Sequence, residues 1–209
     1  MRVELTWLFS RNGQPRWRFY VTNIQGFVTT VAKKSTKRNN CNGMSSTKLV
    51  RQNIWSKLKD VALPDSRFHL NFAEVIPDFL GSAAATERIF SMPIFKHCKY
   101  AFVTPDNCLV ELRRRMLDAG ITLVVSTYGI YRGFYILRPE EIDRRDNLFA
   151  AWLDGLEHFG KPISLAEIGA LGRFDLMVTG ASAVSLDGVR FGKGSVEGNG
   201  TSAARVRAL

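Results

Sequence analysis

Apolar residues after position 44 follow helical and strand-like periods in alternation. The first pattern predicts a helix that Ser45 or Ser46 caps and that ends before Pro64, because its apolar positions recur every three or four residues and proline breaks a helix. These apolar positions are Val50, Ile54, Leu58 and Val61. One amphipathic helix is therefore predicted where the patterned region begins.

Short apolar runs and helical patterns continue to alternate downstream. Further helices are predicted from Ser82 through the Ile89-Phe90 pair, and at 109–119 and 148–159. Strands are predicted at 100–103, 121–125 and 134–137, and from Leu176 onward. This alternation indicates an α/β fold with a mainly parallel sheet, helices on both faces, and ligands at the carboxyl ends of the strands.

The last apolar run is longer than the others. It extends from Leu176 to Val184 and predicts a strand that is covered on both faces. Asp187-Gly188 follows and predicts a tight turn. The segment after this turn is therefore placed at a strand end, where ligands bind in α/β folds.

A basic, glycine-rich loop follows the turn. Arg190 and Lys193 are interleaved there with Gly192 and Gly194. Two cations and backbone amides without bulky side chains suit an anion, of which phosphate is the commonest. A solvated glycine-rich turn has the same composition, so both interpretations stay open at this point.

Two better-known phosphate motifs do not fit this loop. The Walker A motif requires four residues between Gly and Gly-Lys-Ser/Thr, whereas three separate Gly188 from Gly192, and Gly194 replaces the hydroxyl residue. The dinucleotide-binding motif Gly-x-Gly-x-x-Gly fails as well, because Gly198 comes one residue too late. Any phosphate site here is of another type.

Composition places the chain among ordinary globular proteins. Its 209 residues suit one α/β domain with short extensions, and 45% of them are hydrophobic. No apolar run reaches the ~18 residues of a membrane span. Cys41, Cys98 and Cys108 are odd in number and form no Cys-x-x-Cys pair, which favours reduced thiols and a cytoplasmic location.

The net charge of +10 is unevenly distributed. Residues 1–43 hold eight Lys or Arg and one acidic residue, whereas residues 44–209 hold 21 basic and 18 acidic residues. Nucleic-acid binding would therefore have to reside in 1–43, which we interpret as a basic leader and linker. Met44 is a candidate start of the protein, with the leader an upstream in-frame addition.

Two groups of residues invite a functional interpretation that the pattern does not favour. Lys96-His97-Cys98 suggests a metal site, but only His69 and His158 exist elsewhere, so packing and surface exposure are the preferred interpretation and no metal ligand is assigned. The run Arg113-Arg114-Arg115 suggests phosphate or RNA contact. Successive helical residues diverge by about 100°, so a mostly solvated helix face is expected instead.

Two aromatic residues flank Gly129. Tyr128 and Tyr131 suit stacking on a planar ligand such as a pterin or a base. They equally suit loop aromatics that anchor the chain. The two interpretations stay open on the sequence alone.

Several short motifs occur in a characteristic order between Lys48 and Gly194. They are Arg51-x-x-Ile54-Trp55, Ile76-Pro77-Asp78-Phe79-x-Gly81-Ser82, Pro105-Asp106, Leu112-Arg113, Gly120-Ile121-Thr122-Leu123-Val124-Val125, Gly133-Phe134, Asp175-Leu176 and Gly188-x-Arg190-x-Gly192-x-Gly194. Through them the chain resembles the 5-formyltetrahydrofolate cyclo-ligase family, also called methenyltetrahydrofolate synthetases. It is most similar to the divergent branch of methenyltetrahydrofolate synthase domain proteins.

The resemblance implies a fold and a reaction. The fold is a Rossmann-like three-layer α/β sandwich (CoA-transferase-like), here over residues 44–194. The reaction is the ATP- and Mg²⁺-dependent conversion of 5-formyltetrahydrofolate into 5,10-methenyltetrahydrofolate. ATP phosphorylates the formyl oxygen, the folate N10 attacks the activated carbon, and phosphate leaves. The resemblance thus implies a ligase that forms a C–N bond in one-carbon metabolism.

The resemblance also implies site residues. Arg190 and Lys193 are the candidate catalytic residues, and Phe79 and Tyr128 are the candidate contacts of the folate substrate. The candidate nucleotide contacts are Lys48, Arg51, Arg190, Gly192, Lys193 and Gly194. ATP and Mg²⁺ are the implied cofactors and a folate the implied small-molecule partner, whereas no membrane contact is expected.

The sequence departs from the family after Gly194. The family continues its loop into Gly-Tyr-x-Asp, whereas here Ser195 follows and neither Tyr nor Asp occurs through Leu209. The acidic residue of the family's first strand motif is also not clearly present around Ile76-Pro77. Residues 195–209 are interpreted as an irregular tail, with a truncated or frame-shifted ending. The alternative function is therefore a catalytically inactive homologue with a nucleotide-binding or RNA-binding role.

Overall fold

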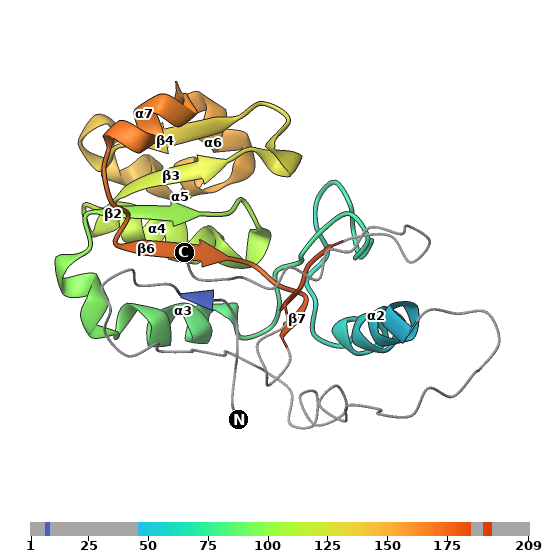
Figure 1. Cartoon of the computed structure of the whole chain (residues 1–209). Helices are drawn as coiled ribbons and strands as arrows, with labels where there is room; N and C mark the ends of the chain where they lie inside the picture. Colours follow the sequence, from blue (N-terminus) through green and yellow to red (C-terminus); the bar gives the residue numbers. More distant parts are fainter. Residues whose placement is uncertain (1–6, 9–45, 185–189, 194–209) are drawn as a thin grey trace.

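A computed structural model describes residues 7–8, 46–184 and 190–193, and within them it contains a six-stranded sheet in the order β1-β6-β2-β3-β4-β5 (Figure 1). The strands are β1 (Trp7–Leu8), β2 (Tyr100–Val103), β3 (Thr122–Ser126), β4 (Phe134–Leu137), β5 (Lys161–Ile163) and β6 (Leu176–Thr179). The α-helices are α2 (Ser46–Leu58), α3 (Ser82–Phe90), α4 (Val110–Asp118), α5 (Asn147–Ala151), α6 (Leu153–Phe159) and α7 (Leu165–Ala170). Short 3₁₀ helices span Pro93–His97, Asn107–Leu109, Tyr128–Ile130, Pro139–Glu141 and Arg144–Asp146. The predicted α/β class is confirmed.

The sheet is mixed rather than mainly parallel. Strand β2 pairs in parallel with both β3 and β6, so that Ala101 lies opposite Leu123 on one side and Leu176 on the other. The pairs β3–β4, β4–β5 and β1–β6 are antiparallel. The prediction of a mainly parallel sheet is wrong because β4 follows β3 after a connection too short for the crossover that a parallel pair requires.

The main core lies between one face of the sheet and four helices. Alternate strand residues such as Val103, Leu123 and Leu176 pack there against side chains of α3, α4, α5 and α6, including Leu112 and Met116. Figure 1 shows α4, α5 and α6 on the same side of the strands. The helices therefore bury this face of the sheet continuously.

The opposite face has a smaller cluster. Val124, Ile136 and Ile163 pack there with Ile168 of α7, and α7 begins with a capping box between Ser164 and Glu167. Helices thus lie on both faces of the sheet, although α7 covers mainly its β4–β5 end.

Helix α2 belongs to a separate packing unit. Its residues Ile54 and Leu58 form a cluster with Phe72 and with Phe191. Phe191 is on β8 (Arg190–Phe191), which pairs antiparallel with β7 (Ala183–Val184) in a second, two-stranded sheet. In Figure 1, α2 lies beside β7 and apart from the main sheet. The glycine-rich segment is therefore attached to α2.

The first helix is shorter than predicted. It ends at Leu58, well before Pro64, and Val61 lies outside it. The chain after Leu58 pairs with a distant segment instead, because the Leu63 amide donates to the Asp78 carbonyl and the Leu80 amide to the Val61 carbonyl. Tertiary backbone pairing thus overrides the helical period at Val61.

The helix predicted at 148–159 is divided in two. Trp152 has an extended backbone (ψ 154°) between α5 and α6. At Gly155 a Cβ would lie 1.9 Å from the carbonyl oxygen of Phe149, so the two helices approach more closely than any other residue would allow. The break places the Ala151 carbonyl where a side chain can bind it.

The last predicted strand is also shorter. Strand β6 ends at Thr179, and Ala183–Val184 belongs to the second sheet. Leu176 and Val178 are buried, but Met177 between them is 45% exposed. The prediction of a strand covered on both faces is therefore wrong, because α7 does not extend over this part of the sheet. The predicted turn at 187–188 lies outside the described residues.

Candidate functional site

The carboxyl ends of the three parallel strands meet at one edge of the sheet. Residues 104–106 follow β2, residues 127–128 follow β3, and residues 180–182 follow β6. In open α/β sheets ligands bind at this edge, so these segments define the candidate site.

Asp106 ties two of the strand ends together. Its Oδ2 atom accepts hydrogen bonds from the Thr104 hydroxyl (2.5 Å) and from the Gly180 amide (2.9 Å). A Cβ on residue 180 would lie 2.6 Å from the same oxygen. Position 180 therefore requires glycine because of this close approach.

Tyr128 occupies the end of β3. Its ring stacks on Phe68 with the centroids 5.4 Å apart, and the Nζ atom of Lys193 lies 3.5 Å from the centroid of the tyrosine ring. Burial raises the pKa of the Tyr128 hydroxyl above its usual value, and the carboxylates of Asp106 and Glu74 add to this effect. The hydroxyl is buried without a hydrogen-bond partner among the described residues, so a polar group of a ligand would satisfy it.

The backbone after Tyr128 is strained. Ile130 has a φ of +61°, which is rare for a β-branched residue and costs about 1–3 kcal/mol. The loop is closed by hydrogen bonds from the Thr127 amide to the Gly133 carbonyl and from the Ile130 amide to the Thr127 carbonyl, both of 2.9 Å. Tyr131 is 90% exposed. Tyr128 is thus held against its neighbours, whereas Tyr131 projects into solvent.

Lys193 brings a cation to this edge. Its side chain is half-buried, and burial lowers the pKa of its ammonium group, whereas the nearby carboxylates of Asp106 and Glu74 oppose the shift. Contact with the tyrosine ring is a cation–π interaction. Lys193 is therefore a cation of reduced hydration, which strengthens its attraction for an anion.

The glycine loop is anchored to α2 by Arg51. The Nη1 atom of this buried arginine donates to the carbonyl oxygen of Gly192 over 3.1 Å. Among the described residues, a Cβ on residue 192 would meet nothing within 4 Å, so with respect to them the glycine leaves open space beside its backbone. From helix α2, Arg51 therefore holds the glycine loop in place and has a supporting role in the site.

The other residues predicted for the site have different placements. Lys48 lies one turn before Arg51 on α2, and Arg190 lies on β8 opposite Val184. Phe79 is 9% exposed and belongs to the main core. Gly194 lies outside the described residues. The structure thus brings Arg51, Gly192, Lys193 and Tyr128 together and places Phe79 in the packing beneath the surface.

Arg113 is a correction to the sequence-based expectation of a solvated face. It is 2% exposed, and its guanidinium donates to three carbonyl oxygens: Nε to Ala151 (2.8 Å), and Nη1 to Thr104 (2.7 Å) and Asp106 (3.1 Å). The helical position shows why: residue 113 comes four residues after Leu109 and three before Met116, on the apolar stripe of α4. Arg114 and Arg115 instead lie at the protein surface.

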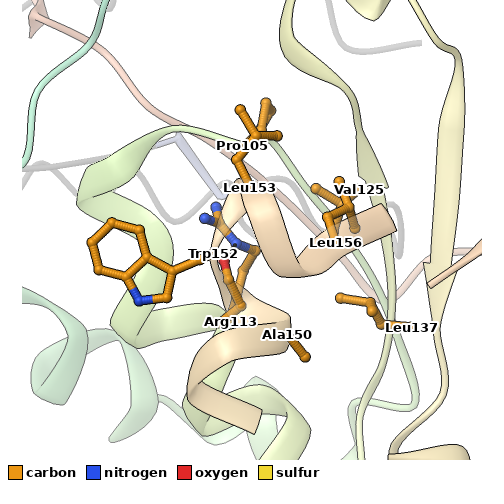
Figure 2. Close-up of a pocket in the computed structure, with 9 residues that line it drawn as sticks. Pro105, Arg113, Val125, Leu137, Ala150, Trp152, Leu153 and Leu156 are labelled. Carbon is orange, nitrogen blue, oxygen red and sulfur yellow. Dashed lines mark hydrogen bonds between the residues drawn. The ribbon is translucent and has the colours of Figure 1, made fainter. Parts of the chain in front are cut away.

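Figure 2 shows the surroundings of Arg113. The cavity beside Arg113 is lined by apolar side chains and has no room for a water molecule. The lining residues are Pro105, Val125, Leu137, Ala150, Trp152, Leu153 and Leu156. Burial lowers the pKa of Arg113 to about 10, and the carboxylate of Asp106 opposes this shift. Arg113 therefore remains charged at neutral pH in a dry environment.

Sequence reasoning assigned no role to Asp106, Glu74 or Gly180. A carboxylate directly after a predicted strand was a usable signal for Asp106. Glu74 and Gly180 carried no local signal, since only the folded backbone brings them to this edge. Ser182 joins them as a second buried hydroxyl without a hydrogen-bond partner in the described part of the chain.

Other groups lie away from this edge. His97 is exposed and Cys98 is buried, with its Sγ atom 4.0 Å from the carbonyl oxygen of Tyr100. Within the described ranges, no three His, Cys, Asp or Glu side chains are arranged to hold a metal ion, and no helix is long and apolar enough to cross a membrane.

Comparison with known proteins supports the resemblance seen in the sequence. The chain is 31% identical over 147 residues to a human protein named methenyltetrahydrofolate synthase domain-containing protein, 30% to the Bos taurus protein and 27% to the Danio rerio protein of the same name. Each match covers 69% of this chain and 37% of the relative, so the chain spans little more than a third of these relatives. No family model and no solved structure matches the chain.

Proposed function

Because the chain belongs to the family of the methenyltetrahydrofolate synthase domain-containing proteins, we propose that it is an ATP-dependent, cyclo-ligase-like protein that converts 5-formyltetrahydrofolate into 5,10-methenyltetrahydrofolate. The observation that carries the proposal is the glycine loop beside the parallel strand ends, with Lys193 over Tyr128 and Gly192 bound to Arg51. This arrangement offers an anion a cation and an accessible backbone at the edge where such folds bind ligands.

The residues present fit the phosphates of ATP. Gly192 leaves space beside its backbone, and Lys193 supplies a partly desolvated positive charge. Arg190 on β8 and Lys48 on α2 are proposed to add further charge, and Gly194 to extend the glycine backbone. Arg51 acts differently, because its guanidinium is used to hold the loop.

The carboxylates at this edge fit a magnesium ion that arrives with the nucleotide. Mg²⁺ in nucleotide sites takes one or two protein carboxylates together with phosphates and water, and Asp106 and Glu74 supply such groups. Both lie near enough to Lys193 to influence its pKa.

The chemistry divides between ATP and the protein. When bound, ATP supplies the phosphoryl group that activates the formyl oxygen. Lys193 would stabilise the negative charge on the transferred group, and the segments that follow the parallel strands would orient the reactants. Such a reaction depends on positioning and charge more than on a protein nucleophile.

We place the folate beside Tyr128 and Ser182. Their buried hydroxyls have no hydrogen-bond partner among the described residues and suit the amide-like groups of a pterin. The Tyr128 ring already contacts Phe68 and Lys193, so its hydroxyl is the proposed contact. Phe79 would support this region through packing.

The test is direct. Purified protein, 5-formyltetrahydrofolate, ATP and Mg²⁺ are mixed, and the near-ultraviolet absorbance of the methenyl product is followed. Absorbance should rise only when ATP is present. Absence of turnover together with absence of nucleotide binding would refute the proposal.

The second candidate is an inactive homologue that binds nucleotide. It is favoured by the sequence after Gly194, which lacks the Tyr and Asp of the family's loop. Calorimetry would then show ATP binding while the absorbance assay stays flat. An RNA-binding role would instead depend on residues 1–43, and deletion to Met44 should abolish it, with binding that falls steeply as salt increases.

A further inference from the structure

The side chain of Lys193 needs an anchor of its own if it is to meet an anion in one fixed place. Arg51 holds the backbone of the preceding residue, because its guanidinium donates to the carbonyl oxygen of Gly192. A lysine side chain has many rotamers, and fixing it on binding costs conformational entropy. Affinity for an anion is therefore higher when another contact orients the ammonium group beforehand.

The ring of Tyr128 supplies such a contact. The Nζ atom of Lys193 lies 3.5 Å from the centroid of this ring. The negative face of an aromatic ring attracts an ammonium group, and the attraction is stronger where the cation is partly shielded from water, as the half-buried Lys193 is. The ring thus sets the place of the positive charge at the end of β3.

Tyr128 is in turn supported by a second ring. Phe68 stacks on it with the centroids 5.4 Å apart and the ring planes 20° from parallel. The Phe68 amide donates to Oδ1 of Asp65 over 2.7 Å, and Oδ2 of Asp65 accepts a hydrogen bond from the side-chain amide of Asn107. Asn107 begins the 3₁₀ helix that follows β2. A continuous series of contacts therefore runs from the end of β2 to the ring that Lys193 contacts.

We propose that Tyr128 is a positioning residue: its ring, supported by Phe68, holds the ammonium group of Lys193 where it meets the phosphates of a bound nucleotide. This role belongs to the ring, whereas the proposed contact with the folate belongs to the hydroxyl. The inference rests on the proposed function for the identity of the anion. The contact between ring and cation can be measured without any ligand.

The first measurement needs no substitution at Tyr128. NMR spectra are recorded on the full chain with labelled lysines and without nucleotide, and the Lys193 signals are assigned with Lys193→Arg. The methylene protons beside Nζ should be shifted upfield by the aromatic ring and should show nuclear Overhauser contacts to the ring protons of Tyr128. Signals at the positions of solvent-exposed lysines, without such contacts, would overturn the inference.

Two substitutions then separate the ring from the hydroxyl. Tyr128→Leu should abolish the upfield shift and weaken ATP binding about threefold to tenfold, because the lysine side chain must then be ordered when the nucleotide binds. Tyr128→Phe keeps the ring and should retain both the shift and the affinity for ATP, although it should weaken folate binding. Calorimetry gives the affinities. Equal losses of ATP affinity in the two variants would refute the role of the ring.

Tyr131→Leu is the matched control, since Tyr131 lies in the same loop and its side chain is 90% exposed. It should change neither the Lys193 signals nor the affinity for ATP, and an effect as large as that of Tyr128→Leu would overturn the inference. Phe68→Leu keeps the proposal testable if Tyr128→Leu does not fold. It removes the stacked ring alone, so the upfield shift of Lys193 should decrease; an unchanged shift would also overturn the inference.

Failure of this inference can be distinguished from failure of the proposed function. If the parent protein does not bind ATP, the proposed function fails, while the NMR signals still decide whether the Tyr128 ring holds Lys193. If the parent protein binds ATP but Lys193 shows no contact with the ring, the inference fails and the proposed function stands.

Discussion

The amide of Gly180 donates to the carboxylate of Asp106 over 2.9 Å and so joins the ends of strands β6 and β2. The contact leaves no room for a side chain, because a Cβ at position 180 would lie 2.6 Å from Oδ2 and 2.8 Å from Cβ of Asp106. The two residues are therefore a matched pair, in which the absence of one side chain admits the other.

Gly180→Ala should destabilise the fold by about 1–3 kcal/mol, because it forces Asp106 away from its donors. Urea denaturation followed by circular dichroism measures the change. Gly169→Ala is the control: it lies in α7, and a Cβ there meets nothing within 4 Å in the described part of the chain, so a gain of about 0.5–1 kcal/mol is expected. Equal effects of the two substitutions would contradict the close approach.

Replacing Lys193 or Arg190 with Ala should weaken ATP binding about tenfold to a hundredfold, because each is proposed to supply a charge-assisted contact worth about 1.5–3 kcal/mol. Isothermal titration calorimetry gives the affinities. Lys161→Ala is the control, since Lys161 lies on the edge strand β5 and pairs with Glu141. Parent-like affinity of both site variants would reject the phosphate site.

Arg51→Met should loosen the glycine loop, because the buried carbonyl of Gly192 loses the guanidinium that donates to it. The expected cost is about 1–3 kcal/mol in the free energy of unfolding, together with weaker nucleotide binding. Chemical denaturation and calorimetry measure the two effects. The exposed Arg88→Met on α3 removes the same charge, and it should leave both quantities within about 0.5 kcal/mol of the parent.

Asp65→Asn should reduce the loss of stability in acid. Burial acts to raise the pKa of Asp65, but backbone hydrogen bonds from Phe68 and Arg67 outweigh it and hold the folded pKa below 3.8. The carboxylate therefore stabilises the fold above its unfolded pKa, and this contribution is lost as the pH falls through the folded value. Urea midpoints from pH 5 downward should fall less steeply in the variant; an identical slope would contradict the assignment. Asp60→Asn is the exposed control.

Ile130→Asn should stabilise the protein by about 1 kcal/mol. Ile130 has a φ of +61° and is 56% exposed, so asparagine relieves backbone strain and sacrifices little apolar burial. Thermal unfolding measures the gain. Tyr131→Asn, at an ordinary φ of −60°, should give no comparable increase. A lower melting temperature of the Ile130 variant would argue against strain in this loop.

The elements that the sequence predicted correctly are those that depend only on the local pattern of apolar and turn residues. Strands at 100–103 and 134–137 match the prediction residue for residue, because short apolar runs between turn signals have few alternatives. Trp152 could not be predicted as a helix break, since it depends on how closely Gly155 approaches the preceding turn. Arg113 was misplaced because residue type was given more weight than its position on an apolar stripe.

The site shows the same division. Lys193 and Gly192 were proposed from the glycine-rich segment and Arg51 from the family resemblance, and the structure places Gly192 against Arg51 and Lys193 over Tyr128. Asp106 and Glu74 act through space on Lys193 and are far from it along the chain. Long-range electrostatics of this kind leave no periodic trace in a sequence.

The mixed sheet has a consequence for the order in which the chain can assemble. Strands β3, β4 and β5 pair with strands that are close to them in the sequence. Strand β2 gains its second parallel partner only when the distant strand β6 has docked and Leu176 lies opposite Ala101. Pairing of distant segments carries the larger loop-closure entropy and is slower. Gly180 reaches Asp106 only when β6 has docked. A chain with an incomplete sheet therefore lacks the edge at which we propose that the ligand binds, and ligand affinity would report on the final stage of folding.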